Sequence, residues 1–224
     1  VSQIGLVQDI AFKISRKQTL KANLWINSND RQIQPLLGSA VRDVQEDRSV
    51  RTVIDYAFTG EKFTWTAKTG ISSDVMVFNT ERNQTRLFLL GTSLDYSFSQ
   101  KWQTLAGIRY SHIKGQLATY DSQEQRLELY QATNFKPWQN LGISMQLRQL
   151  IHEGEAAPFT PSLGVEWAFL TSNRWNWQLI SNLSRSFKIP TLNDRLWVPG
   201  GNPDLNPEKS LSKEIGLTSK AKLS

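Results

Sequence analysis

Apolar and polar residues alternate with a period of two along almost the whole chain. The run L-G-I-S-M-Q-L-R at residues 141–148, for example, puts its apolar side chains on one face and its glycine and polar side chains on the other. We count about eleven such runs, most of 9 to 13 residues. This period indicates β-strands with one apolar and one polar face, and so an all-β fold.

The length of these runs favours a membrane β-barrel over a soluble sandwich. Strands of soluble proteins usually have about 5–6 residues, whereas tilted membrane strands need about 9–11. Hydrophobic residues make up 39% of the chain and the mean hydropathy is -0.42, too polar for a helical membrane protein. Alternate residues alone meet lipid in a barrel, so this composition permits one. We expect an antiparallel up-and-down barrel segment of about eleven long strands.

The alternation assigns each strand residue to the lipid or to the lumen. The residues expected to face lipid are Leu141, Ile143, Met145, Leu147, Leu163, Val165, Trp167, Leu179 and Leu183. Those expected to face the lumen are Gln146, Arg148, Glu166, Gln178 and Asn182.

Short and long connections alternate between the predicted strands. The short turns lie at residues 16–18, 59–62, 99–101, 137–140 and 171–174, and the long links at roughly 29–49, 73–84, 112–125, 151–159 and 188–208. Outer-membrane barrels have short periplasmic turns and longer extracellular loops. We therefore expect all short turns at one end of the sheet and all long links at the other.

Aromatic residues flank almost every short turn, among them Trp65, Trp102, Trp138 and Trp175. Trp and Tyr prefer the membrane–water interface, so these residues predict an aromatic girdle. Ordinary strand aromatics are the competing explanation, but they do not predict clustering beside the turns.

Several glycines fall on the polar face: Gly70, Gly91, Gly107, Gly142, Gly164 and Gly216. Glycine in a strand marks a bend or a close approach. Barrel curvature and a folded body pressed against the inner wall both remain open as causes.

The net charge is +6 and the chain has no cysteine. Lys and Arg are scattered, without a basic run or a nucleic-acid motif, so we expect no nucleic-acid partner. Positive charge that faces anionic lipopolysaccharide, or that lines the lumen, accounts for the surplus. The lack of Cys excludes disulfides and thiolate sites.

The sequence contains little that suggests catalysis. His112 and His152 have no metal-ligand spacing, and we expect both to be solvated loop residues. The polar-face carboxylates are Asp55, Asp95, Glu128, Glu166 and Glu214, beside Arg51, Arg109 and Arg148. Two of them could imitate a glycosidase pair, but an ion-paired lumen fits better. We expect no enzyme, no cofactor and no metal site.

One segment resembles a known family. It reads S-R-S-F-K-I-P-T-L-N-D-R-L-W-V-P-G-G-N-P-D-L-N-P-E-K-S from Ser184, followed by E-I-G-L. This is similar to the barrel signature of TonB-dependent outer-membrane receptors. The matching residues are Phe187, Pro190, Thr191, Leu192, Asp194, Leu196, Gly201, Asn202, Pro203, Leu205, Pro207, Glu208, Ser210, Glu214 and Gly216.

The resemblance implies a bacterial outer-membrane barrel of roughly 22 strands that is filled by an N-terminal plug and powered through TonB. Such receptors import siderophores, cobalamin, haem, sugars or glycans; signalling or binding without transport is the alternative. Residues 1–224 would form a partial barrel domain from the middle of the barrel, without plug and incomplete at both ends. Expected partners are outer-membrane lipid and lipopolysaccharide, the plug and TonB, an extracellular small molecule, and a second copy at open sheet edges.

The prolines of the signature stiffen a link that is too long for a tight turn. We expect an ordered loop folded over the barrel rim, and architecture rather than ligand contact is the favoured role. Ligand sites combine aromatic faces with polar groups and often lie on loops. The candidate ligand-binding residues are Tyr110, His112, Tyr120 and Tyr130 around one loop, and Arg195 and Trp197 in the proline-rich one.

Overall fold

The computed structural model describes residues 1–35, 42–172 and 174–221 of the chain. The long strands in this part are β1 (Ser2–Lys13), β2 (Gln18–Ile33), β3 (Asp43–Thr59), β4 (Phe63–Phe78), β5 (Glu81–Ser99), β6 (Trp102–Gln116), β7 (Asp121–Trp138), β8 (Leu141–His152), β10 (Thr160–Thr171), β11 (Trp175–Lys188) and β12 (Glu208–Ala221). Two short elements accompany them, the strand β9 (Glu155–Ala156) and the helix α1 (Leu192–Leu196). Within the described residues, the helix α1 has five residues and is far too short to span a bilayer, and no other helix there could do so.

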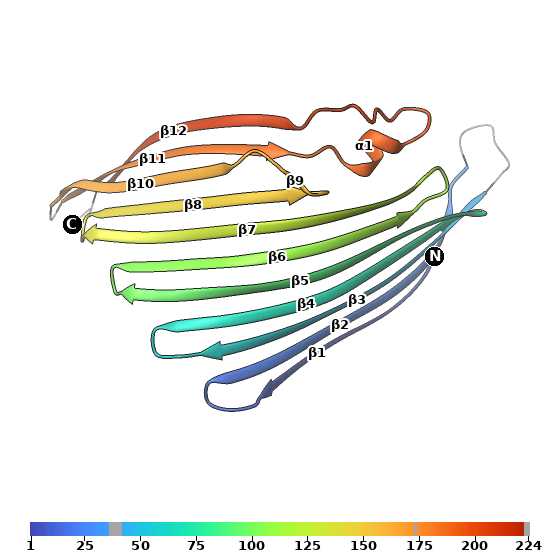
Figure 1. Cartoon of the computed structure of the whole chain (residues 1–224), viewed down its shortest axis with the longest axis horizontal. Helices are drawn as coiled ribbons and strands as arrows, with labels where there is room; N and C mark the ends of the chain where they lie inside the picture. The colour runs from blue at the N-terminus through green and yellow to red at the C-terminus, as the bar shows by residue number, and fades with distance from the viewer. Residues whose placement is uncertain (36–41, 173, 222–224) are drawn as a thin grey trace.

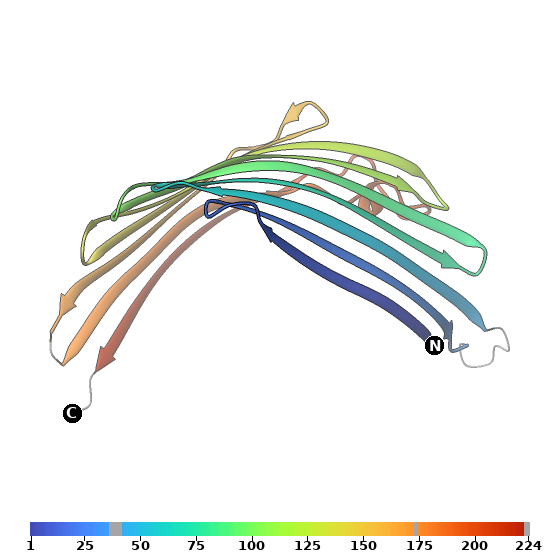
Figure 2. The ribbon, with the colours of Figure 1, turned by 90° about the horizontal axis from the view of Figure 1, so that it is seen from below.

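The long strands form one antiparallel sheet in which each strand pairs with the next along the chain, while β9 pairs with β8 (Figure 1). The predicted up-and-down segment of about eleven long strands is therefore confirmed. The sheet curves into an arch and does not close, so β1 and β12 each pair on one side only (Figure 2). Self-association at these edges stays a prediction.

All the predicted short turns lie at one end of the sheet, and the other connections lie at the opposite end (Figure 1). We call these the turn end and the loop end. This confirms the predicted topology; Asn173, in the last short turn, lies outside the described residues.

The predicted strand and link lengths are wrong at the loop end. The long strands have 12 to 19 residues, and the expected link 73–84 is a tight turn between β4 and β5. Asn79 in this turn has a φ of 53°, which Asn tolerates. The expected link 112–125 shrinks to residues 117–120, and β2 and β3 extend into the link 29–49, whose residues 36–41 lie outside the described part. Strand ends beyond the bilayer have water on both faces, so they need no alternation.

The register confirms the predicted grouping of residues into two faces, because directly opposed residues of an antiparallel pair point to the same side. Leu163 lies opposite Met145 and Leu183, and Trp167 lies opposite Leu141 and Leu179. In the described part, Leu150 is the one buried apolar side chain. A sheet one layer thick with an exposed apolar face needs lipid to cover it.

The polar face carries a network of ion pairs, as the sequence predicts. Glu128 on β7 bonds to Arg148 on β8 at 2.6 Å and lies 3.7 Å from Arg109 on β6. The Tyr130 ring lies over Gly107, where a Cβ atom would collide with it. At Gly107, the close approach of a neighbouring side chain therefore explains the glycine.

Candidate functional site

A buried carboxylate organises the polar face at the loop end. Glu124 of β7 is 2% exposed. Its Oε2 accepts a hydrogen bond from Arg126 at 2.7 Å. Its Oε1 is contacted by Arg195 of α1 and lies 3.4 Å from Nε2 of His152 on β8. Three basic side chains from three elements thus surround one carboxylate, which leaves local positive charge in excess.

Local hydrogen bonds fold the helix that supplies Arg195. The backbone N–H of Asp194 donates to the Thr191 hydroxyl at 3.2 Å, and the backbone N–H of Thr191 donates to the Asp194 carboxylate at 2.8 Å. This reciprocal pair is a capping box. The bond from the Thr191 backbone holds the pKa of Asp194 below its ordinary value. Both residues belong to the family signature, so this part of the signature serves architecture.

The end of the same loop packs tightly against the helix. The Gly201 N–H donates to the Trp197 carbonyl, and the Asn202 N–H donates to the Asp194 carbonyl at 2.9 Å. A Cβ atom at Gly201 would collide with the backbone of Trp197. Only glycine permits this approach. Gly201 and Asn202 are therefore a second pair of signature residues with a structural role.

The link between β11 and β12 carries α1 at the loop end of the sheet (Figure 1). Side chains far apart in sequence dock it onto the polar face. The Tyr120 hydroxyl donates to Asn193 Oδ1 at 2.5 Å, and Arg195 contacts Glu124. Partial burial raises the pKa of the Tyr120 phenol, so the phenol stays protonated and remains a donor at neutral pH. These contacts confirm an ordered loop folded over the rim.

A hollow of about 460 Å³ lies between the loop and the strands that it joins. It is lined by Lys188, Pro190, Asp194, Gly200, Leu205, Asn206 and Glu208. Polar and apolar groups therefore meet beside the docked helix.

The structure divides the predicted ligand-binding residues between the two faces. Tyr110 and His112 lie opposite Leu90 and Phe88 on the apolar face. Tyr130 lies on the polar face, with the Arg109 guanidinium 5.7 Å from its ring. Tyr120, Arg195 and Trp197 gather at the docked loop, where Trp197 ends α1 and is 48% exposed. The four candidates that the sequence groups around one loop therefore do not share one face, and their role in ligand binding stays a prediction.

Sequence reasoning missed the centre of this site. Glu124 was not a candidate, because its partners are up to 71 residues away. His152 is not a solvated loop residue but lies on β8, with its side chain 17% exposed; His112 also lies in a strand. The period-two alternation places Tyr110 and His112 on the same face as Trp102 and Ile108, which is a usable signal against both as ligand-binding residues. In the described ranges, no group of three or more His, Cys, Asp or Glu residues could hold a metal ion.

Comparison with known proteins identifies the family. The model of the TonB dependent receptor-like β-barrel matches residues 12–224. The chain belongs to the TonB-dependent receptor family. Members are outer-membrane proteins of Gram-negative bacteria, and the chain is an outer-membrane β-barrel segment of this family.

Solved receptors share the fold of this TonB-dependent barrel. The siderophore receptor PirA of Pseudomonas aeruginosa superposes with a TM-score of 0.78 at 15% identity, over 96% of this chain and 42% of PirA. The Serratia marcescens hemophore receptor HasR, solved with its hemophore HasA and heme, superposes with a TM-score of 0.74 at 14% identity. The match covers 96% of this chain and 42% of the HasR chain. The vitamin B12 transporter BtuB of Vibrio vulnificus (strain YJ016) is 40% identical over 62 residues, 23% of this chain and 10% of BtuB. The chain spans less than half the length of these relatives.

Proposed function

We propose that this chain forms part of the wall of an outer-membrane transporter that imports a nutrient such as a siderophore, cobalamin, haem or glycan. The family match over residues 12–224 carries this proposal. Similar proteins are named a siderophore receptor and a vitamin B12 transporter, which supports uptake over signalling or binding alone. The receptor family gives no reason to assign catalysis, and we propose none.

The docked loop and the polar face beneath it form the proposed ligand contact. Tyr120 and Trp197 offer aromatic surface, and Arg195 offers charge. The Nε atoms of Arg126 and Arg195 are buried and have no hydrogen-bond partner in the described structure. An acidic or otherwise oxygen-rich group of the ligand suits such donors. Tyr130 belongs to the same face, whereas Tyr110 and His112 do not.

The partners proposed for the complete receptor follow from the family. A plug would fill the lumen, TonB would supply energy through that plug, and lipid would cover the apolar face. Lipopolysaccharide would meet the loop end, because long loops of outer-membrane barrels are extracellular.

Uptake by the complete receptor tests the proposal. Cells that produce it are given labelled siderophore, cobalamin, haem and glycan probes, with and without TonB. We expect TonB-dependent accumulation of one probe. Binding without accumulation would instead identify a signalling or binding receptor and would contradict transport.

The ligand contact is tested with tyrosines on opposite faces. Tyr120→Ala and Trp197→Ala should weaken binding of the accumulated probe by about fivefold, the cost of one lost hydrogen bond or a similar contact. Tyr110→Ala is the matched control from the apolar face and should leave affinity unchanged. Wild-type affinity in both loop variants, with surface levels intact, would remove these residues from the site.

A further inference from the structure

The net charge of the chain is concentrated at the turn end. We define the turn rim as the five short turns, the three strand residues that directly precede and follow each of them, and the last three residues of β12. Its basic residues are Lys13, Arg16, Lys17, Lys62, Lys101, Lys136, Arg174 and Lys220, and its one acidic residue is Glu61. Of the chain's 26 basic residues, 8 lie in the rim, and of its 20 acidic residues, 1 lies there, which gives the rim a net charge of +7. The remaining 18 basic and 19 acidic residues give a net charge of −1.

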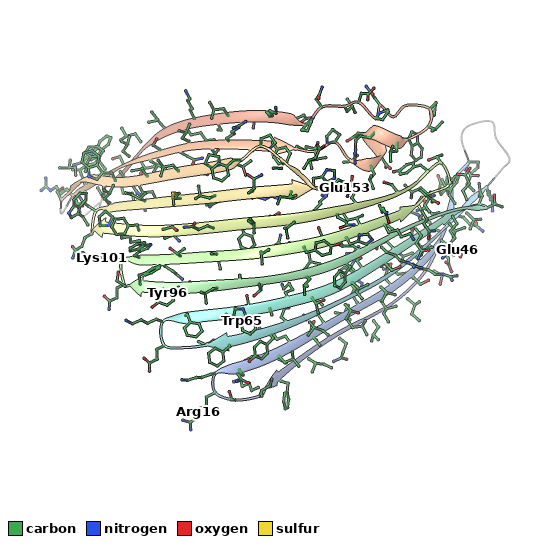
Figure 3. All side chains as sticks on the ribbon, viewed as in Figure 1. Arg16, Glu46, Trp65, Tyr96, Lys101 and Glu153 are labelled. Carbon is green, nitrogen blue, oxygen red and sulfur yellow. The ribbon has the colours of Figure 1, made fainter. Side chains whose placement is uncertain are left out.

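These rim charges are exposed, and carboxylates do not neutralise them. All eight basic side chains are exposed, and within the described ranges none forms a salt bridge. At the loop end, by contrast, Arg31 pairs with Asp47 and Arg126 with Glu124. Figure 3 labels Arg16 and Lys101 at the turn end and Glu46 and Glu153 at the other. The positive surplus therefore lies opposite the end expected to meet lipopolysaccharide.

An apolar groove adjoins the charged rim. It measures about 270 Å³ and is lined by Trp102, Thr133, Phe135, Ile143, Met145 and Leu163. Trp102 stacks on Phe98 with ring centroids 4.5 Å apart. Lys101 directly precedes Trp102 and Lys136 directly follows Phe135. Cationic groups and the apolar groove thus lie at the same end of the sheet, at the level of the aromatic girdle.

We propose that the turn rim binds anionic glycerophospholipids of the membrane leaflet that meets the short turns, which is the periplasmic leaflet in outer-membrane barrels. The lysine and arginine side chains contact the phosphate headgroup, and the groove beside Trp102 holds an acyl chain. Two observations favour a lipid over an acidic soluble protein. The basic residues recur at every short turn instead of forming one patch, and the groove is continuous with the lipid-facing surface.

Fluorescence quenching in vesicles tests this site. The complete receptor is reconstituted into phosphatidylcholine vesicles that contain a brominated lipid, either phosphatidylcholine or phosphatidylglycerol. Bromine quenches nearby tryptophan, so binding at the girdle appears as stronger quenching by one lipid. One basic residue near an anionic headgroup contributes about a fivefold preference. We expect phosphatidylglycerol to be preferred by at least this factor, and the preference to fall as salt rises.

Two variants of equal charge localise the effect. Lys17→Gln, Lys62→Gln, Lys101→Gln and Lys136→Gln together remove four of the eight rim cations and should lower the preference by about fivefold or more. Arg82→Gln, Lys114→Gln, Lys188→Gln and Lys209→Gln together remove the same charge at the loop end and should preserve it. Equal loss in both variants would mean that net charge alone attracts the lipid and would overturn the site. Equal quenching of the wild type by both lipids at low salt would overturn it without any variant, and would leave an acidic protein as the partner of the rim.

Discussion

Val165 and Glu166 are neighbours on β10, yet the two faces of the sheet give them different surroundings. Val165 lies opposite Ile143 on the apolar face, whereas Glu166 lies opposite Gly142 on the polar face and within 3.5 Å of Gln178. On the apolar face, the bilayer stabilises any hydrophobic side chain. The polar face gains stability from particular partners at particular distances. One face therefore tolerates many sequences of one type, and the other depends on individual pairs.

The largest expected effect is an arginine on the apolar face. Val165→Arg in mid-strand should cost about 2–4 kcal/mol, because a charge at the bilayer midplane loses its hydration. Glu166→Arg is the matched control on the polar face and should cost much less. A refolding titration of the complete receptor into vesicles measures both. Equal costs would contradict the assignment of the faces.

Removal of the buried carboxylate should have the next largest effect. Glu124→Gln keeps the shape but leaves Arg126 and Arg195 without a counter-charge. Loss of one partner from a buried polar pair lowers the free energy of unfolding by about 1–3 kcal/mol. Because both arginines are partly exposed, solvent screens their charge and the loss should not exceed this range. Proteolysis of the link 189–207 should accelerate accordingly.

Glu128→Gln provides the control for Glu124, because Glu128 lies on the same strand and face. Its partners Arg109 and Arg148 are about half exposed, so water replaces the lost interaction and the loop should stay protected. Faster proteolysis in this control would mean that general weakening of β7, and not the Glu124 cluster, releases the loop.

The same difference between the faces explains what the sequence could predict. Alternation places Leu163, Met145 and Leu183 together without any knowledge of their contacts, because hydrophobicity alone decides which face meets lipid. For the strand ends near Asn79 the sequence predicts a loop, because water on both faces removes that pattern. The partners of Glu124 come from β8 and from α1, so no local pattern brings them together. The capping box at Thr191 is local and lies inside the signature, where a sequence pattern could have revealed it.

A smaller effect is expected from the helix cap on the polar face. Thr191→Ala removes the hydroxyl that accepts the Asp194 N–H, and loss of such a cap costs about 1 kcal/mol. Hydrogen exchange of the Asp194 amide should quicken, while strand amides of β11 stay unchanged. Thr218→Ala, an exposed threonine on β12, is the control and should leave this amide protected. Unchanged exchange at Asp194 would show that docking through Arg195 alone holds the helix.

The smallest effect is the acid sensitivity of the same cap. The folded pKa of Asp194 lies below its ordinary value of 3.8, chiefly through the backbone bond from Thr191 and with a further contribution from Lys188. A depressed folded pKa means that the carboxylate stabilises the loop at pH values above its ordinary pKa. This stabilisation is lost as pH falls through the folded pKa.

A fluorophore on Gly200→Cys, where the side chain meets open space, should report loop motion that grows in this acidic range. Asp194→Asn cannot lose a charge, so its signal should lack this component, while any acid effect on Glu124 remains in both proteins. Identical pH profiles for the two proteins would show that the Glu124 cluster, and not the cap, makes the loop sensitive to acid.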